Sequence, residues 1–131
     1  PVIASVAGHC VGGALVIAMM ADLLVAAENA RFSYPEAALG FTGGLIAGLA
    51  GRIPHKVAME LMLLCRTLDA QRAYAVGLAN EVAPTGAHVE AALGMARQIA
   101  NRDLLTVRES EDAREAVTAF KEKRKPRFTG R

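Results

Sequence analysis

The chain has 131 residues, a length that suits one domain with one core. Hydrophobic residues make up 53% and charged residues 21%, which is typical of a globular protein and excludes a disordered chain. The net charge of +2 and the aromatic content of 5%, with no Trp, exclude the basic face and stacking platform expected of a nucleic-acid-binding protein.

The N-terminal part of the chain predicts an α/β unit. Residues 2–6 form a β-branched run bounded by Gly8, which predicts a buried strand. Residues 14–20 are apolar on all sides, so we expect a fully buried helix there. Short apolar or alternating runs at residues 23–27 and 31–34 predict two further strands, and strands alternating with helices are typical of the α/β class.

Turn and capping signals place the next elements. Residues 40–51 are Gly-rich and predict a loop that leads into a short helix. Pro54 suits the first position of a helix that ends at Leu64. Asp69 is a favourable N-cap for a helix that ends before Gly77, which suits a C-terminal stop.

The last third of the chain predicts a small strand at residues 80–83 and an amphipathic helix at residues 88–100. The segment 109–125 is charged on most sides, which predicts a surface helix or an arm that docks on a partner. We therefore divide the chain into a core, residues 1–84, and a C-terminal helical region, residues 85–131.

Cysteine use and hydropathy indicate the compartment. Cys10 and Cys65 lie far apart in apolar surroundings, which predicts free buried thiols in the reducing cytoplasm and no metal site. Residues 1–27 are apolar, but they lack a basic start and Asp22 interrupts them. We therefore predict neither a signal peptide nor a membrane span.

Gly12-Gly13 opens the apolar helix and is a candidate anion site. The first N–H groups of a helix have no internal partner, and glycine lets a ligand oxygen approach the backbone closely. Such a site could hold a developing oxyanion. The competing interpretation is a packing turn, which is the commoner use of a Gly pair before a helix.

Glu36 is the candidate catalytic carboxylate, in an apolar segment that Gly40 ends. It could be a proton-transferring group with a pKa raised by its apolar neighbours. Local chemistry alone favours the competing interpretation, a helix N-terminal Glu beside Pro35, which suits the helix dipole.

The remaining polar candidates have plain structural interpretations. His9 could bond a ligand but better suits a packed or backbone-bonded side chain, and the cluster at residues 121–125 is either a solvated face or a phosphate contact. The other members of this group are two predicted surface histidines and two predicted capping or turn carboxylates: His55, His88, Asp22 and Glu28.

Taken in order, these pieces resemble the C-terminal half of the crotonase superfamily, the enoyl-CoA hydratase/isomerase family. The resemblance rests on Pro1-Val2-Ile3-Ala4 with Gly8 and Gly12-Gly13, Ala18-Met19-Met20-Ala21-Asp22, Ala30-Arg31-Phe32 through Pro35-Glu36 to Leu39-Gly40, Ala58-Met59-Glu60-Leu61, Ala70-Gln71-Arg72-Ala73 to Gly77-Leu78, and Ala119-Phe120 with Glu122-Lys123-Arg124-Lys125. It runs over nearly the whole chain.

The resemblance implies a partial ββα spiral with C-terminal helices, a homotrimer or hexamer, and an acyl-CoA thioester as substrate with no other cofactor. The N–H of Gly13 would then be one of two donors to the thioester oxygen as it becomes an enolate. Glu36 falls on the second of the family's two acid/base carboxylates, and Lys123 on a basic position that helps to hold CoA. The remaining residues expected to bind substrate are Gly12, Val16, Tyr34 and Gly44.

Two departures from the family pattern narrow the chemistry. Val16 stands where the family's first carboxylate would lie, three residues after the oxyanion glycine and facing the same side of the helix. The segment 43–46 replaces the different Gly-rich sequence that hydratases carry, so the acyl pocket should differ.

A lone carboxylate favours isomerisation, because moving a proton between two carbons needs one base, whereas hydration must also activate water. Two alternatives remain: hydration with water held by backbone or by His9, and a catalytically weak paralogue that binds acyl-CoA.

The family's upstream half and an extra segment near residues 101–110 have no counterpart in this chain. We therefore expect a chain break or an exposed apolar face near residues 1–6 or 102–110.

Overall fold

The computed structural model describes residues 1–41, 44–101 and 110–130. They form two compact units, Pro1–Gly94 and Met95–Arg131, which are described separately below. The division falls at Gly94, whereas the core predicted from the sequence ended at residue 84.

The described part of the first unit contains two three-stranded sheets. One has the order β1-β3-β6 and is parallel throughout, with strands Ile3–Val6, Leu23–Ala27 and Glu81–Ala83. The other has the order β2-β4-β5, with strands His9–Val11, Arg31–Ser33 and Leu68–Asp69; β2 and β4 are parallel and β5 is antiparallel to β4.

Helices follow the strand pairs. The α-helices are α1 (Gly13–Met20), α2 (His55–Leu64), α3 (Ala70–Ala75), α4 (His88–Asn101) and α6 (Glu111–Lys121), and the 3₁₀-helices are η1 (Pro35–Leu39) and η2 (Gly44–Gly51).

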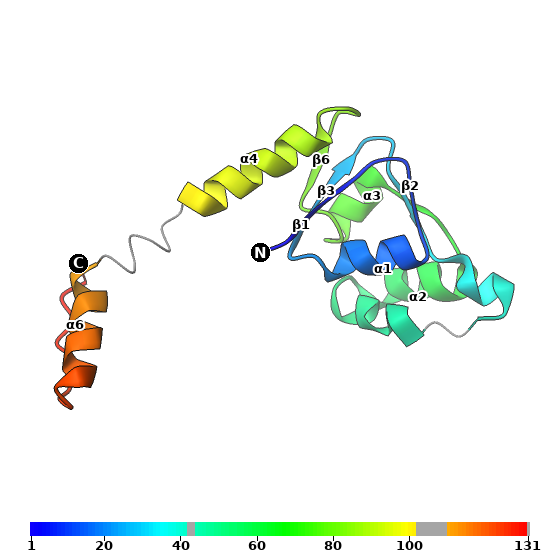
Figure 1. Ribbon diagram of the computed structural model, residues 1–131. Coiled ribbons are helices and arrows are strands. Elements are labelled where there is room, and N and C mark those ends of the chain that lie inside the picture. The colour runs from blue at the N-terminus through cyan, green and yellow to red at the C-terminus, as the bar shows by residue number, and fades with distance from the viewer. Residues whose placement is uncertain (42–43, 102–109, 131) are drawn as a thin grey trace. The chain divides into compact units, whose positions relative to one another are not determined.

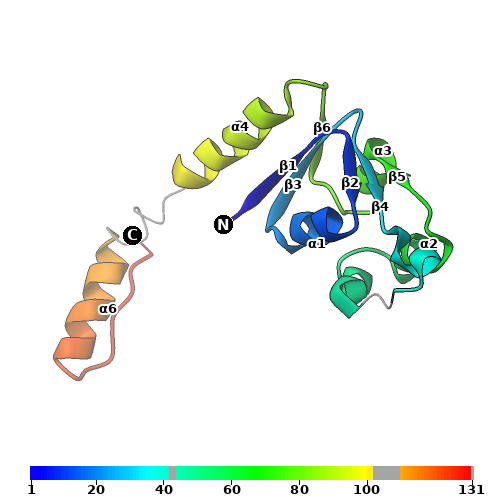
Figure 2. The same cartoon turned by 45° about the vertical axis from the view of Figure 1, so that its right-hand side comes forward.

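The chain repeats a strand–strand–helix unit. In chain order, β1 and β2 lead into α1, and β3 and β4 lead into η1. The first strand of each unit joins one sheet and the second strand joins the other. Figure 1 and Figure 2 show the paired strands side by side, with α1 next to them. Because both strand pairs run parallel, each turn of the chain lies beside the previous one. This is the predicted ββα spiral.

A single apolar cluster fills the first unit. Its largest fully buried side chains include Phe32 of β4, Leu15 of α1, Ile46 and Leu49 of η2, and Leu61 of α2. Each such side chain contributes about 1.5–3 kcal/mol relative to an exposed one. The cluster thus joins α1 to η2, and η2 in turn packs on α2.

The capping predictions for α3 are confirmed. The Asp69 carboxylate accepts a hydrogen bond from the Arg72 N–H at 2.8 Å. Gly77 has φ 80°, and the N–H groups of Gly77 and Leu78 return to the carbonyls of Tyr74 and Ala73. This Schellman arrangement stops the helix where the sequence predicted. Pro54 lies one position earlier than predicted, as the N-cap of α2.

Four burial predictions are wrong, one of them the buried thiol predicted at Cys65, which is only half-buried. α1 buries Leu15, Ala18 and Met19, but Ile17 is 76% exposed and Met20 62% exposed. The strand predicted at residues 2–6 is an edge strand and is only partly buried, because β1 pairs with β3 on one side alone. His88, predicted at the surface, is half-buried with an unpartnered Nδ1.

Of the exposed apolar face expected near residues 1–6, the structure shows one large exposed side chain, Val2 at 65%, while Ile3 and Val6 are half-buried. The other expected location, residues 102–110, lies outside the described residues apart from Ser110.

In the second unit the chain folds back along α6. Ser110 caps the helix by accepting a hydrogen bond from the Ala113 N–H. After the helix, Lys123 adopts φ 54° and Arg124 forms a two-pronged ion pair with Glu115, with N–O distances of 2.5 and 2.9 Å. The Asp112 carboxylate accepts hydrogen bonds from the backbone of Thr129 and Gly130. None of the described helices combines the length and apolarity needed to cross a bilayer.

Candidate active site

The site begins where β2 turns into α1. Gly12 has φ 57° and ψ −119°, a combination that side chains disfavour, which explains the glycine at this position. Its N–H donates to the Ser33 carbonyl at 3.0 Å, and its carbonyl accepts from the Val16 N–H at 3.1 Å. Gly12 is therefore tied to the end of β4 on one side and to α1 on the other.

Gly13 is the first residue of α1 and is exposed. The helix has no side-chain N-cap and no acidic residue in its first turn. Among the described residues we find no hydrogen-bond acceptor for the Gly13 N–H. The N–H is thus free to donate to a ligand oxygen, as the oxyanion interpretation requires.

Strand pairing brings Glu36 to this glycine pair. Val11, the last residue of β2, is in register with Ser33, the last residue of β4. The chain beyond each strand therefore leaves the sheet at the same edge, one segment into α1 and the other into η1. Glu36 is the second residue of η1 and so lies beside Gly12.

The carboxylate of Glu36 packs directly on the backbone of Gly12. A Cβ atom at residue 12 would lie 2.5 Å from Glu36 Oε1, so the carboxylate would have to move to make room for it. Glu36 Oε2 is buried and has no hydrogen-bond partner among the described residues. A buried carboxylate oxygen without a partner is costly, and such groups occur at functional sites. The Glu36 side chain is half-buried, and its Oε2 atom is shielded from solvent.

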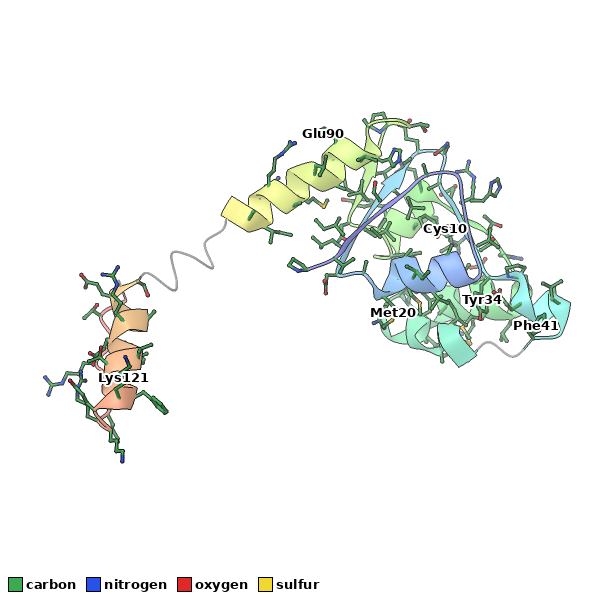
Figure 3. The ribbon with its side chains drawn as sticks, in the orientation of Figure 1. Cys10, Met20, Tyr34, Phe41, Glu90 and Lys121 are labelled. Carbon is green, nitrogen blue, oxygen red and sulfur yellow. The ribbon has the colours of Figure 1, made fainter. Side chains whose placement is uncertain are left out.

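Tyr34 and Cys10 both have a raised pKa, which favours their uncharged forms. Tyr34 is 5% exposed, and Figure 3 shows it close to the N-terminal end of α1. Burial raises the pKa of the Tyr34 phenol, and the negative charge of Glu36 raises it further. Burial also raises the pKa of the Cys10 thiol, which makes Cys10 a packing residue rather than a nucleophile.

Val16 lies one turn into α1, is half-buried and packs against the apolar cluster. It supplies no acid or base within reach of the Gly13 N–H. Among the described residues no group of three or more His, Cys, Asp or Glu side chains could hold a metal ion.

The other sequence candidates lie elsewhere. Gly44 is the exposed first residue of η2, and Lys123 is an exposed residue of the second unit. His9 is exposed on β2 and His55 at the start of α2. Asp22 has the predicted structural role, since it accepts a hydrogen bond from the Val2 N–H at 2.7 Å. The structure therefore gathers Gly12, Gly13, Tyr34 and Glu36.

Comparison with known proteins decides the family. A sequence profile described as Enoyl-CoA hydratase/isomerase matches residues 1–109. The chain belongs to the enoyl-CoA hydratase/isomerase family. It is 33% identical over 158 aligned positions to a putative enoyl-CoA hydratase from Thermus thermophilus, covering 98% of this chain and 62% of that protein. It is 32% identical to a carnitinyl-CoA dehydratase from Proteus mirabilis, covering 100% and 64%.

Solved structures agree with this assignment to the crotonase fold. The crystal structure of an enoyl-CoA hydratase from Mycobacterium tuberculosis matches with a TM-score of 0.78 and 33% identity, covering 100% of this chain and 64% of the other. The chain thus spans less than two thirds of the length of these two curated relatives. The 158 aligned positions also exceed its 131 residues, so the Thermus protein carries internal residues that this chain lacks.

Sequence reasoning missed one residue of this region. Arg52, the residue directly after η2, donates to the Met19 carbonyl at the C-terminal end of α1. No local pattern signals such a contact, because its partner lies 33 residues away.

Proposed function

We propose that the protein moves a proton within acyl-CoA thioesters, with Glu36 as the base and the Gly13 N–H as an oxyanion donor. In a 3-enoyl-CoA, Glu36 removes a proton from C2, between the thioester carbonyl and the double bond, and the electron pair shifts to the thioester oxygen. The Gly13 N–H stabilises the resulting dienolate, and Glu36 returns the proton to a different carbon. Acid/base catalysis of this kind is worth roughly 10²–10⁴ in rate.

The observation that carries the proposal is the position of the Glu36 carboxylate. It packs on Gly12, directly before the free N–H of Gly13, and its Oε2 atom is buried without a partner among the described residues. A substrate C–H bond can use such an oxygen, because no described side chain competes for it. The neutral phenol of Tyr34 is a further part of the proposed substrate surface.

Isomerisation is favoured over hydration because Val16 provides no second carboxylate to hold water. Hydration or dehydration is the second candidate, and the relatives' names support it, since they include an enoyl-CoA hydratase and a carnitinyl-CoA dehydratase. In that case backbone groups or His9 would have to hold the water molecule.

The two candidates differ in products. The protein is offered 2-enoyl-CoA and 3-enoyl-CoA in ¹⁸O-labelled water, and the double-bond position and label uptake are followed. We expect the double bond to move faster than label is incorporated. Efficient label uptake would favour hydration instead. Val16→Glu is the matching gain test, and it should raise label uptake if the variant folds.

Glu36→Gln tests the base directly. The amide keeps the shape of the side chain and loses the proton acceptor, so turnover should fall at least about 100-fold while acyl-CoA still binds. Glu28→Gln is the matched control, because Glu28 is an exposed carboxylate in the turn after β3. Retention of most activity in Glu36→Gln would eliminate Glu36 as the base.

The proposed CoA contact at Lys123 can be separated from its role in the fold. Lys123 has φ 54° after α6, where its N–H and that of Arg124 close the helix. Lys123→Gly keeps this turn and removes the charge. We expect weaker CoA binding, with the largest loss at low salt, because the missing attraction is electrostatic. Equal affinity at every ionic strength would assign the cluster at residues 121–125 to the solvated surface.

A further inference from the structure

α1 lacks a group that would stabilise its own C-terminal end. The last carbonyls of a helix have no intrahelical partner and carry partial negative charge. α1 has no basic residue in its last turn. The Ala18 carbonyl accepts from the Ala21 N–H at 3.3 Å, which satisfies one of these groups from within the same segment.

Arg52 supplies the missing cation from a different element. Its Nε atom donates to the Met19 carbonyl at 3.0 Å and its Nη1 atom to the Gly48 carbonyl at 3.3 Å. The Nη2 atom contacts the Met20 sulfur at 3.6 Å. One guanidinium group therefore bonds to α1 and to η2 at the same time.

Gly48 leaves the space that this guanidinium occupies. A Cβ atom on Gly48 would lie 3.2 Å from Arg52 Nη1. Apolar packing joins the same two elements, because Leu15 and Met19 of α1 share the buried cluster with Leu49 of η2. The Arg52 hydrogen bond and the apolar packing thus both hold the C-terminal end of α1 against η2.

A shift at one end of α1 changes the orientation of the other because the helix is short. Its eight residues span about 12 Å at 1.5 Å per residue, and a helix of that length behaves as a rigid rod. Because Gly12 is held by the Ser33 carbonyl, a shift at Met19 tilts α1 about that end and changes the direction of the Gly13 N–H. Misplacement by about 1 Å in a catalytic geometry can lower a rate by about 10²-fold.

We propose that Arg52 is a positioning residue, which fixes the C-terminal end of α1 against η2 and thereby aims the Gly13 N–H at the thioester oxygen. The proposal rests on the proposed function for its effect on rate. It makes a separate claim about α1 that can be measured without substrate.

The first test compares Arg52→Gln, Arg52→Lys and the control Arg66→Gln. Arg66 is an exposed arginine that pairs with Glu60, away from α1. We expect Arg52→Gln to lower kcat about 10-fold, per folded molecule, with KM within about twofold of wild type. Arg52→Lys, which keeps one donor and the charge, should recover part of the rate, and Arg66→Gln should match wild type.

The second test measures the position and the stability of α1 directly. The ¹⁵N–¹H resonance of Gly13 and the hydrogen exchange of the α1 amides are measured in the same variants. We expect the Gly13 resonance to shift and α1 exchange to accelerate in Arg52→Gln but not in Arg66→Gln. Gly48→Ala, which presses on the guanidinium while Arg52 stays in place, should produce a smaller change in the same direction. It carries the test if Arg52→Gln does not fold.

The outcomes separate the two claims. If wild type turns over no enoyl-CoA, the proposed function fails, and a shifted Gly13 resonance in Arg52→Gln or Gly48→Ala would still support the positioning role. An unmoved Gly13 resonance overturns the proposal whether or not the protein is active. A fall in kcat that disappears once the folded fraction is taken into account, with KM unchanged, also overturns it, because Arg52 would then contribute stability alone.

Discussion

Gly12 and Glu36 depend on one another at the scale of single residues. The glycine is required twice, once by its positive φ of 57° and once by the carboxylate that packs against its Cα. From the sequence, the approach of a ligand oxygen was enough to explain the glycine pair. The structure adds a contact inside the protein, because the Glu36 side chain uses the space that a Cβ atom would occupy.

Gly12→Ala should therefore damage activity and stability together. The new Cβ atom would displace the Glu36 carboxylate, and alanine at φ 57° adds backbone strain of about 1–3 kcal/mol. We expect a fall in turnover of at least about 100-fold and a lower midpoint of urea unfolding. Gly51→Ala is the control, because a Cβ atom there meets nothing within 4 Å. Normal activity in Gly12→Ala would mean that the contact between Glu36 and Gly12 does not constrain the base.

At the scale of elements, the sequence predicted best where the determinants are local. The N-cap at Asp69 and the stop at Gly77 depend on residues within one helical turn, and both are confirmed. Strand β2 was missed because its three residues lie between Gly8 and Gly12, which indicate turns, and β5 was missed because two residues are too few for an alternating pattern. The exposed side of α1 was missed as well, since apolar residues on all sides cannot tell which face is covered.

The Asp69 cap gives a prediction for α3. Asp69→Ala removes the acceptor for the Arg72 N–H and should lower the free energy of unfolding by roughly 1 kcal/mol. Asp69→Ser keeps a side-chain oxygen in the same place and should lose only a fraction of that. Urea unfolding of both variants measures the difference. Equal stability of wild type and Asp69→Ala would show that water replaces the cap without loss.

The stability of α6 and of the chain that follows it should fall at low pH. Hydrogen bonds from Arg124, together with the Arg127 N–H, lower the pKa of Glu115 from 4.5 to about 2. A depressed folded-state pKa stabilises the folded form above pH 4.5, and the contribution is lost as the pH falls from 4.5 toward 2. We expect an NMR titration of the Glu115 carboxyl to have its midpoint near 2, and Arg124→Gln to move it toward 4.5. An unshifted midpoint in wild type would show that the ion pair does not persist in solution.

At the scale of the whole molecule, the candidate site shows what a sequence can and cannot supply. Gly13 and Glu36 were both identified, because each stands out locally and the family resemblance joined them. Their proximity depends on the register that aligns Val11 with Ser33, a pairing between residues far apart in the chain. The Arg52 contact with Met19 is of the same long-range kind, and it had no local signal at all.

The first unit leaves large apolar side chains exposed on and beside β1, β2 and α1, and we expect it to associate through them: Val2, Val11, Ile17 and Met20. These side chains are between 40% and 76% exposed, and β1 lies at the edge of its sheet. Exposed apolar patches and open strand edges both favour association. We expect light scattering to give this chain a mass above 13.8 kDa that rises with concentration.

Ile17→Lys should lower that mass, because it places a charge at the most exposed of these apolar side chains. Leu63→Lys is the matched control, since Leu63 is 68% exposed on α2 and is not one of these side chains. If Leu63→Lys lowers the mass and Ile17→Lys does not, association uses α2 instead. A constant mass of 13.8 kDa at all concentrations would contradict association in either way.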